Sequence, residues 1–200
     1  MTISFRESTT TDRRALQAVA AQFFVNGAVL ASFVPRLPEI RDSLGLSLDE
    51  LGAILTAGAA LGLLASLWSP RIIAAFGTRR ALILFVLVLL CGLQIVGLAE
   101  AWWMLLLGSA VMLAADGVVD IAMNLQGSWL SSRRHAPVMN RLHGLWSLGA
   151  VTGGIVAAQA AATGISLRMH LIVVSAVLLV ALVFVGSGLL KVDEDTNIEF

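Results

Sequence analysis

Residues 81–99 read ALILFVLVLLCGLQIVGLA, a stretch that contains no lysine, arginine, aspartate or glutamate. At a rise of about 1.5 Å per residue, a helix of this length crosses the hydrocarbon core of a bilayer, which is about 30 Å thick. Five more apolar stretches of comparable length occur at 15–35, 48–69, 101–130, 142–163 and 169–190. The sequence therefore predicts an all-α membrane protein with six transmembrane helices.

The composition is typical of a chain whose main solvent is lipid. Hydrophobic residues make up 58% of the sequence and charged residues 13%, and the mean hydropathy is +0.89. Soluble domains are about 45–50% apolar and about 25% charged. The formal net charge of +0 gives no reason to expect a nucleic-acid partner. The first apolar stretch is too long for a cleaved signal peptide, so we expect it to stay as an anchor, and we expect Cys91 to be a small buried residue.

The distribution of arginine and lysine predicts the orientation. Positive residues favour the cytoplasmic side of a membrane. On this basis we expect a multi-pass protein of the bacterial inner membrane with both termini in the cytoplasm, a cytoplasmic tail at 1–14, a bundle at 15–190 and a polar acidic tail at 191–200. Three of the 13 basic residues fall on the other side, Arg36, Arg41 and Arg168, and ten on the cytoplasmic side: Arg6, Arg13, Arg14, Arg71, Arg79, Arg80, Arg133, Arg134, Arg141 and Lys191.

One internal repeat is visible. Residues 51–62 align with residues 142–153 at an offset of 91, so that Gly58 meets Gly149 and Gly62 meets Gly153. The two stretches belong to helices that run in opposite directions. Three helices repeated with inverted topology would explain this pattern. The alternative is that small residues recur in any packed membrane helix.

Two aspartates lie inside the fourth apolar stretch. Asp116 and Asp120 are four residues apart, so they share one helix face. A charged side chain at such depth costs roughly 2.5–3.5 kcal/mol on insertion scales, and it usually faces a cavity in which it binds and releases protons. The alternative is a structural carboxyl group that is hydrogen-bonded to a neighbouring helix. Asn124 continues the same face by one turn.

Other polar and aromatic residues could complete a cavity. Asn26 and Gln22, in the first stretch, carry amides that could bind a polar solute, although single amides more often join helices. Trp146 offers a flat surface on which a sugar ring could stack. Histidine is the side chain that most often exchanges protons at physiological pH, which makes His143 a candidate, yet a histidine beside an interfacial arginine is often only a boundary residue.

The order Asp120-x-x-x-Asn124, a basic loop, and then His143-Gly-x-Trp-Ser-x-Gly-Ala resembles the fucose-permease-like branch of the major facilitator superfamily. The stretch at 33–40, FVPRLPEI, is also similar to that branch. The resemblance implies half of a twelve-helix transporter. It also implies that a carboxylate at the position of Asp120 takes part in proton-coupled sugar uptake.

Two motifs depart from the family pattern. In the loop at 74–80 the family's glycine and arginine pair is kept as Gly77, Arg79 and Arg80, which the resemblance implies are conformational residues. Its acidic position is Ala74, so we expect a weaker latch between transporter halves. The run at 149–154 lacks the proline of the antiporter signature, which argues against drug–proton antiport.

We therefore expect a secondary transporter, or its amino-terminal half, for a small polar solute such as a sugar, coupled to protons. The alternatives are efflux of amphipathic compounds, and a truncated or accessory membrane protein without transport of its own. The expected partners are the lipid bilayer, the solute, protons, and a carboxy-terminal half or a second copy of the chain. No enzymatic set, metal site or cofactor is expected.

Overall fold

The computed structural model describes residues 10–190, and over this range the chain is helical. Six of its helical segments are long and apolar enough to cross a membrane, which confirms the predicted fold class. In chain order the elements are α1 (Thr10–Ala31), the 3₁₀-helix η1 (Val34–Arg36), α2 (Leu37–Ser43), α3 (Leu48–Ser66), α4 (Ser69–Gly97), α5 (Trp102–Arg134), α6 (Met139–Ala162) and α7 (Leu167–Gly188).

Local sequence fixes where two of the spans begin. Ser47 caps α3, and its side chain and that of Glu50 bond reciprocally to each other's backbone N–H groups in a capping box. The Ser166 side chain accepts a hydrogen bond from the Met169 N–H and caps α7. Trp102 and Trp103 open α5 and are exposed, as expected for indoles near a membrane surface.

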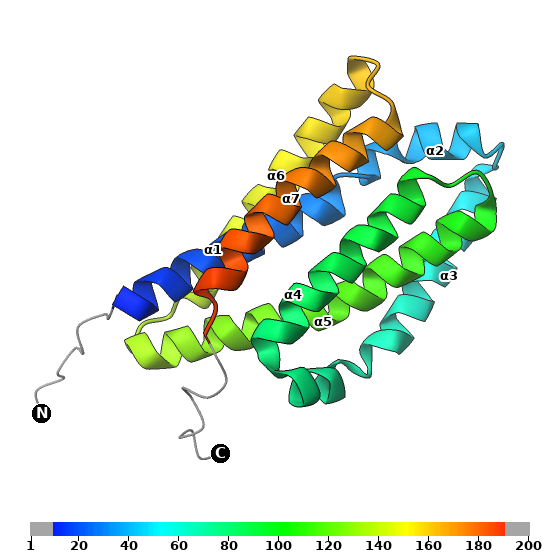
Figure 1. Ribbon diagram of the computed structural model, residues 1–200. Helices are drawn as coiled ribbons and strands as arrows, with labels where there is room; N and C mark the ends of the chain where they lie inside the picture. Colours follow the sequence, from blue (N-terminus) through cyan, green and yellow to red (C-terminus); the bar gives the residue numbers. More distant parts are fainter. Residues whose placement is uncertain (1–9, 191–200) are drawn as a thin grey trace, which may run out of the picture.

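Glycines bring α6 against α1. A Cβ added to Gly149 would lie 2.0 Å from the Phe24 carbonyl oxygen, and one added to Gly153 would lie 2.4 Å from that of Ala28. No side chain fits in so short a distance, so the two backbones touch here because both positions are glycine. Figure 1 shows α6 running along α1, with α7 on the same side of the bundle.

The same arrangement recurs between α3 and α5. A Cβ at Gly58 would lie 2.9 Å from the Ser109 Cβ, and one at Gly62 would lie 2.6 Å from the Leu113 Cβ. These glycines are the repeat equivalents of the two on α6. A single offset of 85 relates their contacts on α5 to those on α1 (109 − 24 and 113 − 28). The α3–α5 pair therefore repeats the α6–α1 pair, as a 3+3 inverted repeat requires.

Both the first and the last residue of the first span differ from the expectation. Helix α1 begins at Thr10 rather than at 15 and ends at Ala31 rather than at 35. Its early start is tied to α5 by an ion pair of 3.1 Å between Asp12 and Arg133. After Ala31 the chain forms η1 and the short helix α2, which sequence patterns did not predict, with a proline in the first turn of each.

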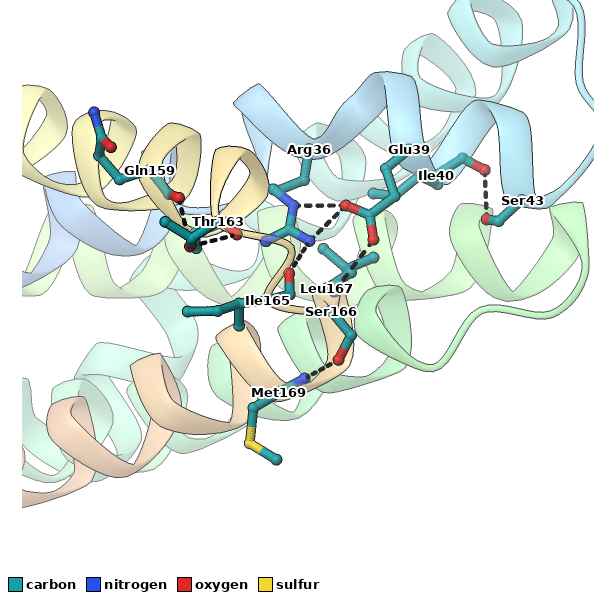
Figure 2. Close-up of polar contacts among 11 residues, drawn as sticks. Arg36, Glu39, Ile40, Ser43, Gln159, Thr163, Ile165, Ser166, Leu167 and Met169 are labelled. Atoms are coloured by element: carbon teal, nitrogen blue, oxygen red, sulfur yellow. Dashed lines mark hydrogen bonds and ion pairs between the residues drawn. The ribbon is translucent and has the colours of Figure 1, made fainter.

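Helix α2 is fastened to the turn between α6 and α7. The Arg36 guanidinium is buried and donates to Glu39 at 2.7 Å from Nε, and to the Ile165 carbonyl at 2.7 Å from Nη2. Glu39 in turn accepts from the Leu167 N–H at 3.3 Å. Figure 2 shows these groups converging from three segments. This cluster lies at the end of the bundle opposite to Thr10 and holds α2 against the turn between α6 and α7.

Two expectations about α4 were wrong. The third span begins at Ser69 rather than at 81, because the expected loop before it is helical on both sides of a kink at Gly77. Gly77 has φ 72°, a left-handed conformation that favours glycine. Cys91 is exposed rather than buried, since it lies on an outer face of α4.

Candidate solute and proton site

The candidate site lies where α1, α5 and α6 meet. Its position follows from a close approach of two backbones, because a Cβ at Gly27 would lie 2.1 Å from the Trp146 carbonyl oxygen. This contact sets the Trp146 region of α6 next to Asn26, the neighbour of Gly27 on α1. Asn26 is buried and Trp146 is half-buried against the apolar core.

Asp116 and Asn26 lie on two helices that pack against each other. Asp116 is half-buried on α5, and Asn26 is buried on α1. The Oδ1 atom of Asp116 is buried and has no hydrogen-bond partner of standard geometry. Both amide atoms of Gln22, one turn before Asn26, are likewise buried and without a partner. The α1–α5 contact therefore holds polar atoms that the described residues leave unsatisfied.

Asp120 is the exposed member of the pair. Asn124 donates from Nδ2 to the Asp120 carboxylate at 3.1 Å and to the Asp120 carbonyl at 2.8 Å. His143 lies on α6, and its ring packs edge-on against Phe23 of α1, with 5.3 Å between ring centroids.

Of the predicted residues, the structure joins Asp120 to Asn124 by a hydrogen bond and packs His143 on Phe23, while Asn26 and Asp116 lie on the adjacent helices α1 and α5. Trp146 lies one turn along α6 from His143. These side chains offer hydrogen-bond donors and acceptors for hydroxyl groups, and a carboxylate beside an imidazole can exchange a proton. Within residues 10–190, no three His, Cys, Asp or Glu side chains are placed to hold a metal ion.

The three predicted conformational residues lie apart from this site, around the kink of α4. Gly77 forms the kink, and Arg79 donates from Nε to the Gly186 carbonyl of α7 at 2.9 Å. Arg80 is exposed. Arg79 therefore joins α4 to α7 within this chain, which the sequence pattern did not reveal.

Several polar contacts were missed by sequence patterns. Gln126 is fully buried and binds Thr78 and Leu190, and Gln94 donates to the Leu171 carbonyl and to Ser175. The available signal was a lone glutamine in an apolar span, which indicates a contact between helices without naming the partner. Phe23 could not be found, because an aromatic residue in a membrane helix carries no distinguishing signal.

Comparison with known proteins gives the family. The family model described as Major Facilitator Superfamily matches residues 19–199. Membrane protein MosC of Rhizobium meliloti is 32% identical over 138 residues, which are 69% of this chain and 34% of that protein. An uncharacterized MFS-type transporter of Yersinia pestis is 28% identical over 66% of this chain and 34% of its own length.

An uncharacterized transporter of Sinorhizobium fredii gives a similar match, 28% identical over 68% of this chain and 36% of its own length. The matched region thus spans about a third of the length of each of these relatives. The six membrane spans, the inverted repeat and the family match agree with one another. The chain is a transporter-type membrane protein rather than an enzyme, and it belongs to the major facilitator superfamily.

Proposed function

We propose that this chain contributes to proton-coupled secondary transport of a small polar solute, such as a sugar. Asp120 carries the proton, and Asp116, Asn26 and Asn124 bind the solute. Trp146 lines the path, and His143 exchanges the proton with Asp120. The role given to Asp120 is the one that the resemblance to the fucose-permease-like branch implies.

The observation that carries the proposal is the buried Oδ1 atom of Asp116, which has no hydrogen-bond partner and lies on a membrane span one turn from the exposed carboxylate of Asp120. An ionisable group in a span is costly and is expected to serve a pathway. The unpartnered atoms of Gln22 and Asp116 also favour a polar ligand or water at this place. Two structural carboxyl groups would need no such set of unsatisfied neighbours.

Asp120 and His143 lie on an exposed surface of the bundle, which we call the polar face and which must be shielded from lipid. Asp120 and His143 are exposed, and unsatisfied polar groups in hydrocarbon cost several kcal/mol each. We propose that a carboxy-terminal transporter half or a second copy of the chain covers this face. The orientation proposed is cytoplasmic for the end that carries Thr10 and Leu190, which we call the basic end because Arg79, Arg80 and Arg133 lie there.

Ligand binding tests the solute class. The purified chain in lipid nanodiscs is titrated with monosaccharides and with amphipathic cations while tryptophan fluorescence is recorded. We expect saturable quenching by a sugar that is lost in Trp146→Phe and weakened by Asn26→Ala. Trp103→Phe is the matched control, because this exposed tryptophan at the start of α5 lies far along the helix from Asp116.

The same titration separates the alternatives. Saturable quenching by amphipathic cations without a response to sugars would favour the efflux alternative and reject the sugar assignment. A response that Trp103→Phe abolishes and Trp146→Phe leaves intact would place the ligand elsewhere on the protein. Absence of any response when the polar face is covered by a second half would favour an accessory role.

A further inference from the structure

The last residues of the bundle are held by side chains from α4 and α5. Gln126 donates from Nε2 to the Leu190 carbonyl at 3.0 Å and accepts from the Leu190 N–H at 3.0 Å. The same Nε2 donates to the Thr78 hydroxyl at 2.8 Å. Arg79 adds its bond to the Gly186 carbonyl. The chain therefore leaves the bundle at a fixed point beside residues 78–80.

A groove opens at this point. It has a volume of about 920 Å³ and runs along the bend that Gly77 introduces into α4. Among the described residues that line it there are two arginines, Arg79 and Arg80, and no carboxylate, and other lining side chains are apolar, among them Ile73, Phe76, Leu125 and Trp129.

The segment that follows Leu190 has the opposite charge. Residues 191–200 read KVDEDTNIEF, with acidic residues at 193, 194, 195 and 199 and a single lysine at 191. An extended chain covers at most about 3.3–3.6 Å per residue, so position 194 lies within roughly 14 Å of Leu190. Because Thr78 lines the groove and shares the Gln126 amide with Leu190, Leu190 lies beside the groove that holds the two arginines.

We propose that residues 191–200 dock in this groove, with the carboxylates of Asp193, Glu194 and Asp195 against Arg79 and Arg80. A guanidinium binds a carboxylate through two parallel hydrogen bonds, and such charge-assisted pairs are stronger than neutral ones. The apolar side chains of the lining offer a place for Val192 or Ile198. This contact goes beyond the proposed function, since it depends neither on the solute nor on the direction of transport.

Disulfide trapping tests the proposal in the full chain. Cys91→Ser removes the native thiol. One cysteine is then placed at Asn197 and a second at Ala75, an exposed residue that lines the groove. The matched control places the second cysteine at Gln17, an exposed position on α1. Helix α1 flanks the exit from another side, because a Cβ at Gly188 would lie 2.6 Å from Ala18 and 3.0 Å from the Arg14 carbonyl.

We expect the 75–197 pair to crosslink at least about tenfold faster than the 17–197 pair, because docking raises the local concentration of one thiol at the other. Replacing the three acidic residues (D193N, E194Q and D195N) changes no side chain of the described bundle. It should make the two cysteine pairs crosslink at equal rates. Equal rates for the two pairs, or a preference that persists in the neutralised chain, would overturn the proposal.

A competing occupant is the headgroup of an anionic phospholipid. The reaction of Ala75→Cys with a water-soluble maleimide is therefore measured in nanodiscs of phosphatidylglycerol and of phosphatidylcholine. Docking predicts that the acidic segment shields position 75 in both lipids and that neutralising it exposes the thiol in both. Shielding that requires phosphatidylglycerol and ignores the acidic segment would assign the groove to lipid and reject the proposal.

Discussion

The contact between α6 and α1 makes a sharp prediction about stability. Gly149→Ala adds a methyl group 2.0 Å from the Phe24 carbonyl oxygen and 2.8 Å from its carbonyl carbon. Both contacts are with backbone, so no side-chain rotation relieves them. To reach an ordinary separation the helices must move apart by about 1 Å, which loosens their dispersion contacts along the interface.

The magnitude follows from two opposing effects. Overpacking of a well-packed interface costs about 1–3 kcal/mol. Replacing a helical glycine by alanine gains up to about 1 kcal/mol in helix propensity. We expect a net loss of about 1–2 kcal/mol for Gly149→Ala. The matched control is Gly154→Ala on the same helix, where nothing lies within 4 Å of the added Cβ, so only the gain remains.

The assay is reversible unfolding of the purified protein in mixed micelles of a mild detergent and increasing sodium dodecyl sulfate, followed by circular dichroism. Gly149→Ala should unfold at a lower mole fraction of dodecyl sulfate than the parent, and Gly154→Ala at the same or a higher one. Equal midpoints for the two variants would refute the close approach of α1 and α6 and, with it, the position of Asn26 beside α6.

Three other outcomes follow from the fold. Arg36→Gln removes charged hydrogen bonds from a buried group and should cost about 2 kcal/mol in the same unfolding assay, whereas Arg41→Gln, which breaks only an exposed pair with Asp42, should cost less than about 1 kcal/mol. A reporter fused after Leu190 should be active only as a cytoplasmic reporter; activity of a periplasmic reporter there would contradict the orientation. If the chain pairs with itself through the Asp116 and Asp120 face, sedimentation should show weaker association at pH 8 than at pH 5, and association that is constant with pH would exclude that face.

The spans and the repeat could be predicted because they depend on hydropathy and on small residues, both of which are local in sequence. Gly58 and Gly149, which the repeat offset of 91 relates, make equivalent contacts. Gly58 of α3 packs on α5, and Gly149 of α6 packs on α1. The start of α4 could not be predicted. A charged, proline-containing segment suggests a loop, whereas burial of Ser69 and Ile73 and the freedom of Gly77 keep it helical around a kink.

The candidate site was predictable as a set of residue types but not as contacts. Asp120 and Asn124 share a helix face, and the structure joins them by a hydrogen bond. The contacts between helices, Trp146 against Gly27 and His143 against Phe23, depend on how α1 and α6 dock. Such docking arises from glycine contacts across the whole interface, and no single stretch of sequence encodes it.

The coupling of protons to solute movement by Asp120 can be measured as proton flux in liposomes. The chain is reconstituted together with a carboxy-terminal half, a pH-sensitive dye is enclosed, and an outward-to-inward gradient of the bound solute is imposed. Asp120→Asn keeps the shape of the side chain and removes its titratable proton. Asp49→Asn is the matched control, because this exposed carboxyl lies in the first turn of α3, away from the site.

We expect solute addition to acidify the lumen with the parent chain and with Asp49→Asn, and to leave the luminal pH unchanged with Asp120→Asn. Acidification by Asp120→Asn at the rate of the parent chain would show that Asp120 does not couple protons to solute movement.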